Sequence, residues 1–371
     1  MTPRPSPRLE ATLRAATHRL NTKGIESASV DARLLLAHVL NLTRADLIAQ
    51  SARTLTPFES ESFEALLQRR EAYEPVARIL GEREFSGLPF ALNEATLDPR
   101  PDSETLVEEV LKRLKTAGYF GTAHDDRFLN PALSTVIPAK AGVTGRRCDD
   151  TRESMPCRRR GSSPPRILDL GTGSGCLLLA ILHAWSEAIG LGVDIAPRAV
   201  AQARQNARAL ELSKRARFRV GTWGEGLKKP FDLVISNPPY IPTSVIPGLM
   251  PDVRLYDPLA ALDGGPDGLD AYRALLPDVR RLLKPGGFVM LEVGEGQAQA
   301  VESLLAAAGF LHTFRAQDLA GIERCVGGER GPSGTGSSLS SSRRRPGPQD
   351  VGQSCQESLG TPAFAGVTTL S

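Results

Sequence analysis

The first part of the chain carries its apolar residues at spacings of three and four, the period of an amphipathic helix. This pattern begins at Leu9 and continues to about Leu80. Pro57, with two threonines just before it, marks the start of one helix, because proline suits the first helical turn and threonine can cap it. We therefore predict a small helical domain over residues 1–82.

A different pattern occupies residues 83–117, where a hairpin and a helix are expected to connect the helical domain to the rest of the chain. Residues 85–90 place an aromatic residue on each side of a glycine-containing turn, which is typical of a short β-hairpin. Two prolines then flank Arg100 and favour an extended loop. We expect Asp102 or Ser103 to cap the helix that follows.

Short apolar runs alternate with helical patterns over residues 166–330. Near-continuous apolar strands separated by helices are typical of a doubly wound parallel sheet of the α/β class, and we predict that fold here. The strands are expected at residues 166–170, 189–194, about 217–220, 231–236 and 288–292, with two more near residues 311–316 and 323–326.

Two segments lack this periodicity, residues 118–165 and residues 331–371. Both are rich in Gly, Pro, Ser and Arg, and they share a near-repeat, because residues 138–144 and 362–368 agree at six of seven positions. Low complexity without apolar periodicity predicts disorder. The alternative is that their arginine clusters form basic arms for nucleic acid.

Composition narrows the possible functions. A formal net charge of +3 is small for 371 residues, so we expect no direct nucleic-acid partner. The five cysteines form no C-x-x-C pair, which argues against a zinc site or a disulfide framework and fits a cytoplasmic protein. No apolar run approaches the roughly 20 residues that span a bilayer. We therefore expect no metal and no membrane association, and a monomer.

Chemistry-bearing residues lie where the predicted strands end. Gly171, Gly173 and Gly175 follow the first strand, where ligands of open α/β sheets bind, and glycines let a ligand approach the backbone closely. Their spacing differs from the G-x-G-x-x-G of dinucleotide folds and lacks the Lys-Ser/Thr of a phosphate loop, which disfavours pyrophosphate binding. Asp169, just before the loop, suits an ammonium group such as that of a methionine moiety.

Asp194 and Trp223 indicate a nucleoside ligand. Asp194 ends the second predicted strand, where a carboxylate can accept hydrogen bonds from both ribose hydroxyls, although NAD enzymes share this feature. Trp223 follows the third strand, and its ring can stack on a base. A partly buried tryptophan at the rim of a site is the structural alternative.

The sharpest motif is Asn237-Pro238-Pro239-Tyr240, directly after the fourth strand. Its prolines remove two backbone donors and stiffen the turn, which leaves the Asn237 side-chain oxygen and the Pro238 carbonyl as fixed acceptors. Two acceptors would orient a planar amino group and raise the electron density on its nitrogen, and Tyr240 offers it a flat face. With the glycine loop and Asp194, the motif predicts an S-adenosylmethionine-dependent methyltransferase acting on a planar amino group.

The chain resembles the peptide-chain release factor glutamine methyltransferases, the HemK family, over roughly residues 9–118 and 165–329. Generic amino methyltransferases share only the glycine loop and the Asn-Pro-Pro-Tyr of this resemblance. It implies a class I methyltransferase domain that methylates the glutamine of the Gly-Gly-Gln motif in class 1 release factors, with the helical domain docking the release factor. The resemblance rests on residues 85–90, 99–104, 169–175, 237–240, 261–269 and 292–294.

The same resemblance implies the residues of the site. The cofactor S-adenosylmethionine would be bound by Gly171, Thr172, Gly173, Ser174, Gly175, Asp194, Trp223 and Asn237. The glutamine amide would be gripped by Asn237, Pro238, Pro239 and Tyr240, with Asn237, Pro238 and Tyr240 as the catalytic residues.

Two positions depart from the family pattern. Asp257 stands where the family typically has Glu, which puts a hydrogen bond made there in doubt. Thr222 stands where an aspartate often precedes the tryptophan, which predicts weaker cofactor contacts. Two other functions stay open: methylation of a ribosomal-protein glutamine or of an exocyclic nucleobase amine, which this motif does not distinguish from an amide, and a non-catalytic binding module.

Overall fold

The computed structural model describes residues 8–116 and 163–332. These residues belong to one unit, Met1–Pro332. Nearly all of the two segments for which disorder is expected, residues 118–165 and 331–371, lies outside the described residues.

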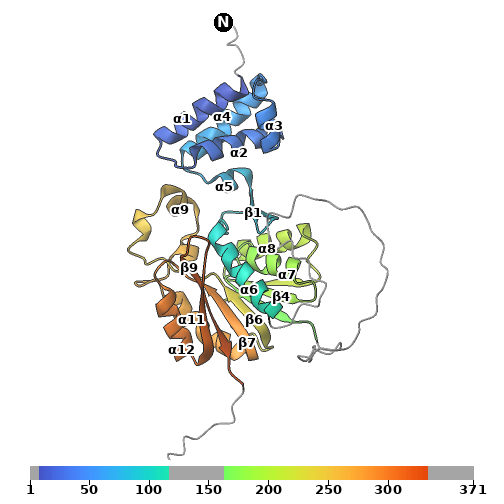
Figure 1. Cartoon of the computed structure of the whole chain (residues 1–371), viewed down its shortest axis with the longest axis vertical. Coiled ribbons are helices and arrows are strands. Elements are labelled where there is room, and N and C mark those ends of the chain that lie inside the picture. Colours follow the sequence, from blue (N-terminus) through green and yellow to red (C-terminus); the bar gives the residue numbers. More distant parts are fainter. Residues whose placement is uncertain (1–7, 117–162, 333–371) are drawn as a thin grey trace, which may run out of the picture. The chain divides into compact units, whose positions relative to one another are not determined.

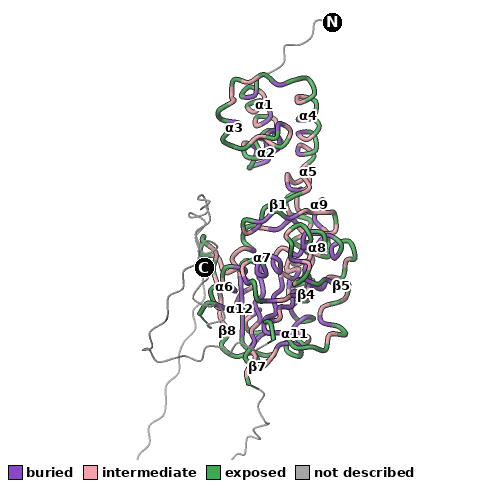
Figure 2. The backbone as a smooth tube through the Cα atoms, turned by 90° about the vertical axis from the view of Figure 1, so that its right-hand side faces the viewer, coloured by how far each residue is buried: buried purple, intermediate pink, exposed green. Residues whose placement is uncertain are grey.

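The N-terminal helices form a bundle with a core of its own (Figures 1 and 2). Leu20, Leu35 and Leu67 are buried in that core, and burial of such apolar stripes stabilises helices that would be marginal alone. The predicted helix start at Pro57 is confirmed, because the Thr56 side chain and the residue three positions later form a capping box. The helices are α1 Leu9–Thr22, α2 Ala28–Leu40, α3 Arg44–Ala49, α4 Pro57–Glu71 and α5 Val76–Leu80.

The hairpin expected after the bundle is present as β1 Glu82–Phe85 and β2 Leu88–Ala91, paired antiparallel. The expected cap of the next helix is wrong. Asp102 and Ser103 lie inside a 3₁₀ turn, Pro101–Ser103, which runs directly into α6 Glu104–Thr116. Their side chains have other partners, because Asp102 pairs with an arginine of a distant strand and Ser103 accepts a hydrogen bond from Asn237.

The remaining described residues form a seven-stranded sheet in the order β5-β4-β3-β6-β7-β9-β8. Strands β3 to β7 run parallel, as predicted, whereas β8 and β9 complete the sheet as an antiparallel hairpin. The strands are β3 Arg166–Leu170, β4 Ile189–Asp194, β5 Ala216–Val220, β6 Phe231–Ser236, β7 Leu283–Glu292, β8 Phe310–Gln317 and β9 Glu323–Arg330.

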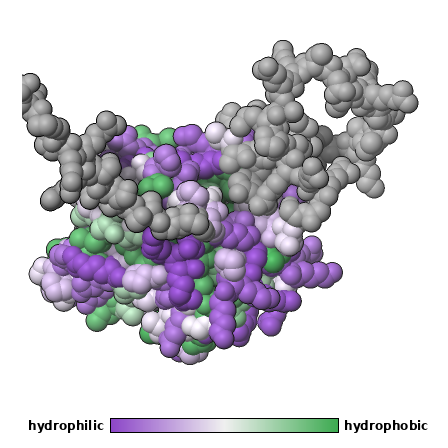
Figure 3. Space-filling model, turned by 90° about the horizontal axis from the view of Figure 1, so that it is seen from below, coloured by the Kyte–Doolittle hydropathy of each residue, from purple (hydrophilic) through white to green (hydrophobic). Residues whose placement is uncertain are grey.

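Helices cover both faces of this sheet (Figure 1). One core contains buried residues of α6, α7 and α8, and the other contains those of α11 and α12. The surface of the molecule seen from below in Figure 3 is largely hydrophilic, with smaller hydrophobic areas among the hydrophilic ones. These helices and the short ones after β6 are α7 Cys176–Ala184, α8 Pro197–Ala209, η4 Ile246–Gly248, α9 Pro251–Tyr256, α10 Leu259–Leu262, α11 Asp270–Leu282 and α12 Ala298–Ala307.

The strand order reverses beside β3. The chain runs from β3 outward through β4 to β5 and then returns to the other side of β3 as β6. Because Leu170 is level with both Val193 and Ser236, the loops that leave β3, β4 and β6 start side by side. Such a reversal is where doubly wound sheets bind their ligands.

Candidate active site

A pocket of about 310 Å³ lies at this reversal. Its wall combines the glycine loop after β3, the end of β4 and the start of the Asn-Pro-Pro-Tyr segment after β6 with residues of the loop before α6 and of α10. Eight of the eleven predicted site residues line it, namely Gly171, Thr172, Gly173, Ser174, Asp194, Trp223, Asn237 and Pro239.

Three other predicted site residues lie outside this lining. Gly175 is the N-cap residue just before α7, with φ +82°, and a Cβ there would come within 3.2 Å of Leu179, so a glycine is needed for packing as well as for the loop geometry. Pro238 is buried. Tyr240 packs against the core that α11 and α12 cover, and its backbone carbonyl accepts a hydrogen bond from Gln297.

Asp194 links the glycine loop to the end of β4. One carboxylate oxygen accepts the N–H of Gly173 at 2.8 Å, and the other accepts the N–H of Ala196 at 2.9 Å. Burial raises the pKa of the Asp194 carboxyl, while these N–H groups act in the opposite direction. Each oxygen of a carboxylate can accept more than one hydrogen bond. The side chain can therefore hold the loop and still accept the hydroxyls of a ligand in the pocket.

Asp169 lies beneath the glycine loop rather than on the pocket wall. Its side chain is fully buried, and one carboxylate oxygen accepts the Thr172 hydroxyl at 2.6 Å. Among the described residues the other oxygen has no hydrogen-bond partner. Burial raises the pKa of Asp169 to about 7. A buried, unpaired carboxylate oxygen under the loop fits a cationic group of a ligand above it, although the structure does not bring Asp169 itself to the surface of the pocket.

Trp223 is held in an unusual backbone conformation with φ +43°. The next residue fixes it, because the N–H of Gly224 donates to Asp278 at 3.0 Å and the Gly224 carbonyl accepts from Arg281 at 2.9 Å. Non-glycine residues in this region persist where their surroundings determine them, often at functional sites. The ring lies beside Gly171, with Cζ3 3.8 Å from where a Cβ of Gly171 would be. A flat indole thus faces the glycine loop.

The Asn237 side chain has a defined orientation. Its Nδ2 donates to the hydroxyl oxygen of Ser103 at 3.3 Å, which leaves Oδ1 available to another donor. Three positions after Asn237, Tyr240 is surrounded by Gly264, Gly268 and Gly294, which belong to the segments 261–269 and 292–294. A Cβ on Gly264 would lie 2.8 Å from the Tyr240 Cα, and one on Gly268 would overlap the Tyr240 carbonyl. Because these residues are glycines, the two segments can pack directly against the Asn-Pro-Pro-Tyr motif and hold it in place.

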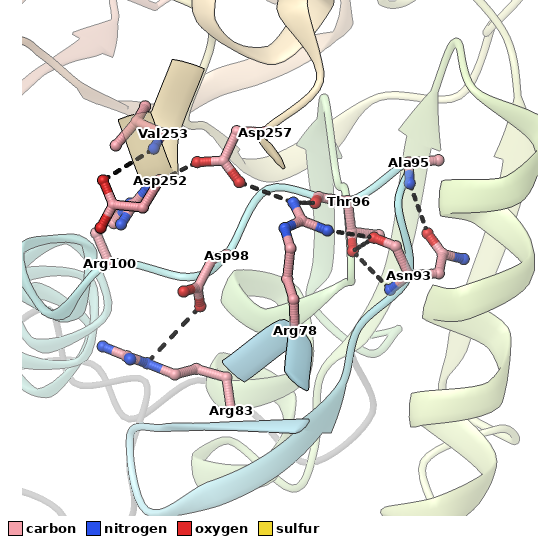
Figure 4. Close-up of polar contacts among 10 residues, drawn as sticks. All are labelled: Arg78, Arg83, Asn93, Ala95, Thr96, Asp98, Arg100, Asp252, Val253 and Asp257. Carbon is pink, nitrogen blue, oxygen red and sulfur yellow. Dashed lines mark hydrogen bonds and ion pairs between the residues drawn. The ribbon is translucent and has the colours of Figure 1, made fainter. Parts of the chain in front are cut away.

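Asp257 joins three segments of the chain (Figure 4). One oxygen of its buried carboxylate accepts from Arg78 of α5 at 2.7 Å, and the other accepts from Arg100, which lines the pocket, at 2.6 Å. The expectation that Asp in place of Glu weakens this position is therefore wrong, since both oxygens are bonded. The two arginines reach the shorter side chain because they come from opposite directions.

Arg78 and Asp98 belong to the same cluster, and neither was predicted from the sequence. Arg78 also donates to the carbonyls of Asn93 and Thr96, which fixes the loop that forms one side of the pocket (Figure 4). Asp98 is buried with Arg83 3.8 Å away, and burial raises its pKa. The Asp-Pro-Arg-Pro-Asp run marked this loop as unusual, but nothing local indicated its partner in α5.

In the part of the chain that the structure describes, His, Cys, Asp and Glu side chains form no group that could hold a metal ion. Of the helices described, none has the length and apolar character to cross a membrane.

Comparison with known proteins matches both parts of the chain. A profile described as PrmC N-terminal domain matches residues 11–81, and one described as Methyltransferase domain matches residues 162–323. A release factor glutamine methyltransferase of Rhodospirillum rubrum is 44% identical over 85% of this chain and 83% of its own length. Proteins of the same name from Bradyrhizobium diazoefficiens and Caulobacter vibrioides are 42% and 39% identical, over 87% and 86% of this chain and 95% of their own lengths.

Proposed function

Because the chain belongs to the release factor glutamine methyltransferase family, we propose that it methylates class 1 peptide-chain release factors. The methyl group of S-adenosylmethionine would be transferred to the side-chain amide nitrogen of the glutamine in their Gly-Gly-Gln motif. The observation that carries this proposal is the pocket itself, in which Asp194 and Asn237 lie at the ends of β4 and β6, the two strands that flank β3.

The residues present fit S-adenosylmethionine. Asp194 would accept the ribose hydroxyls, the Trp223 ring would lie along the adenine, and the glycine loop would let the methionine part approach its backbone. The unpaired oxygen of Asp169 beneath the loop would attract the ammonium group. When bound there, the cofactor supplies an electrophilic methyl group on its sulfonium sulfur.

At the other end of the pocket, Asn237 would orient the substrate amide. The lone pair of an amide nitrogen is delocalised, so the nitrogen is a poor nucleophile. Asn237 Oδ1, left free because Nδ2 donates to Ser103, would accept one N–H of the glutamine, and the Pro238 carbonyl would accept the other. The transfer would then depend on positioning and electrostatics, without a covalent enzyme intermediate.

The N-terminal bundle would dock the release factor, and the enzyme would act as a cytoplasmic monomer on a protein substrate. The pocket is small and would also hold the cofactor, so it can bind little more of the substrate than the glutamine side chain and its neighbours. Affinity for an entire release factor therefore requires another surface, and the bundle, which has a hydrophobic core of its own, would supply it.

Mass spectrometry of both purified release factors, after incubation with the protein and isotopically labelled cofactor, tests the proposal. We expect one labelled methyl group on the Gly-Gly-Gln glutamine and none when that glutamine is replaced by alanine. The Asn237→Ala variant should lose methyl transfer while calorimetry shows nearly unchanged cofactor binding, because Asn237 Oδ1 acts on the substrate. Methylation of a ribosomal protein or of nucleic acid, with release factors unmodified, would contradict the proposal.

A further inference from the structure

Glu292, the last residue of β7, is a buried acid next to the proposed substrate amide. The register of β6 and β7 pairs Ser236 with Leu291, so the next residues along, Asn237 and Glu292, are neighbours where the two strands end. The Glu292 residue is 2% exposed, and among the described residues its Oε2 has no hydrogen-bond partner. The mechanism above gives this side chain no role.

Ser103 connects Glu292 to Asn237. The Ser103 oxygen accepts the Nδ2–H of Asn237 at 3.3 Å. The Ser103 hydroxyl and the Asn237 amide both favour the charged form of the Glu292 carboxyl and lower its pKa. Since a hydroxyl that accepts at its oxygen can donate through its hydrogen, Ser103 can link Asn237 to the Glu292 carboxylate.

Two charged residues, Asp102 and Arg324, act on the Glu292 carboxyl. Burial raises the pKa of Glu292 to about 7; the Ser103 hydroxyl lowers it, the Asp102 carboxylate raises it, and Arg324 and the Asn237 amide lower it. Other titratable groups face Glu292 from the elements packed around it. They are Tyr240 after β6, Cys325 of β9, Cys176 of α7 and Tyr272 of α11, whose hydroxyl donates to the Glu292 backbone carbonyl at 2.8 Å.

We infer that Glu292, in its ionised form, is a positioning residue for the methyl transfer proposed above, holding the Asn237 amide through Ser103 with Oδ1 toward the substrate. A negative charge on the Nδ2 side of this amide polarises it and makes Oδ1 a stronger acceptor. It also stabilises the positive charge that develops on the substrate nitrogen as the methyl group arrives. This inference rests on the proposed function.

Protonation of Glu292 reverses the arrangement. A neutral carboxyl can donate its own O–H to Asn237 Oδ1, which would rotate the amide and occupy the oxygen that the substrate needs. The ionised fraction rises as pH passes through about 7. The turnover number should therefore increase from pH 6 to pH 8, by about tenfold per pH unit on the acid side.

The test compares kcat and KM for a release factor between pH 5.5 and 9 in the wild type and in Glu292→Gln. Glutamine keeps the shape and can accept from Ser103, but it carries no charge. We expect kcat at pH 8 to fall about tenfold or more, KM to change little, and the dependence on pH near 7 to disappear. An unchanged kcat and an unchanged pH profile in Glu292→Gln would overturn the inference.

Asp102→Asn serves as the matched variant. It removes a negative charge that raises the pKa of Glu292 and releases Arg324 from an ion pair, and both changes favour the ionised acid. The midpoint of the kcat profile should move to lower pH, which a merely structural role of Glu292 would not produce. A midpoint that stays in place would count against the inference.

A measurement without substrate separates this inference from the proposed function. In the ¹⁵N–¹H spectrum of the full chain, the side-chain NH₂ signals of Asn237, identified by their loss in Asn237→Ala, should shift with pH around a midpoint near 7. The same signals should not titrate there in Glu292→Gln. If they do not titrate in the wild type, Glu292 does not control the amide, whatever the substrate of the enzyme is.

Discussion

At the scale of single residues, Asp194 has two functions in the site, and a substitution tests its part in cofactor binding. It accepts the Gly173 and Ala196 N–H groups and faces the pocket. Asp194→Ala removes the acceptor of two ribose hydroxyls, and hydrogen bonds to a charged group contribute about 1.5–3 kcal/mol. Calorimetry should show S-adenosylmethionine affinity at least about tenfold weaker. Asp318→Ala, in the turn between β8 and β9, is the control and should bind normally; equal affinities would refute the assignment.

Burial of the Asp169 carboxyl should make the folded protein less stable as pH rises. Its folded pKa, about 7, lies above the ordinary value of 3.8, so the folded state holds the proton more tightly than the unfolded state does. Wild-type stability contributed by this group is present below about pH 4 and is lost as pH rises to about 7. Asp169→Asn cannot lose that proton, so its stability relative to wild type should improve over this range, by an amount on the order of 4 kcal/mol at most.

Urea unfolding of wild type and Asp169→Asn at pH 5 and pH 8 measures this change. The same variant should bind S-adenosylmethionine more weakly, because the negative charge beneath the glycine loop is gone. Improved stability with weakened binding is the usual cost of a strained functional group. Stability curves that stay parallel from pH 4 to 8 would show that the burial of Asp169 has no such consequence.

At the scale of elements, Gly264 and Gly268 show how a loop fixes the Asn-Pro-Pro-Tyr motif. Gly268 has φ +77° and touches the Tyr240 carbonyl, so Gly268→Ala adds both backbone strain, about 1–2 kcal/mol, and a steric clash. We expect a lower melting temperature and a kcat reduced more than the cofactor affinity. Gly248→Ala, where nothing lies within 4 Å and φ is ordinary, is the matched control. Similar losses in both variants would remove this role of the loop.

Asp257 joins α5 to the loop before α6 through its ion pairs with Arg78 and Arg100, and substituting it tests how much these pairs stabilise the fold. Asp257→Ala leaves Arg78, whose side chain is 8% exposed, without its carboxylate, and breaking a buried ion pair costs about 3–5 kcal/mol. Unfolding in urea should show that loss, whereas Asp267→Ala, which breaks an exposed pair with Arg273, should change little. The loop at residues 95–100 should also loosen, so cofactor binding should weaken. A stability like that of Asp267→Ala would contradict the buried pairing.

Sequence periodicity predicted the elements better than their ends. β6 was placed at its observed bounds because its apolar residues are consecutive, whereas β7 begins at Leu283 and β9 extends to Arg330, beyond the predicted limits. Each of these strands contains a pair of glycines, at residues 286–287 and 327–328. In β9, Gly327 leaves room for the ring of Phe314 on the neighbouring strand. Such cross-strand contacts involve residues distant in sequence, which no local pattern contains.

The candidate site, too, could be predicted only where a local pattern marks its residues. The glycine loop, Asp194 and Asn237 could be predicted because each follows a strand end, and strand ends meet in a parallel sheet. Ser103, Arg78 and Glu292 could not be given roles, because their partners Asn237 and Asp257 are far along the chain. Residues 99–104 and 292–294 carry part of the family resemblance, but the contacts that give Ser103 and Glu292 a role are visible only in the folded chain.

At the scale of the whole molecule, the segments outside the described residues give a direct prediction. Residues 120–160 and 333–371 lack the apolar periodicity needed to join a core, so ordering them would cost conformational entropy without compensation. A chain without both segments should keep its melting temperature and its activity toward release factors, as scanning calorimetry and methyl-transfer assays would show. A large decrease in either would mean that these segments take part in the structure or the reaction.

The last prediction concerns the separate contributions of the bundle and of the pocket to substrate recognition. Specific recognition by a remote surface can be used to lower the barrier at the reacting centre, so a docked substrate reacts faster than the glutamine alone. A chain beginning at residue 74 keeps α5 and the Arg78 contact to Asp257 but lacks the other helices of the bundle. Its kcat/KM should fall at least about tenfold with an intact release factor and change little with a short Gly-Gly-Gln peptide. Cofactor affinity, measured in parallel, verifies that the pocket is intact. If both substrates lose activity equally while cofactor binding is kept, the bundle supports the catalytic domain and does not dock the release factor.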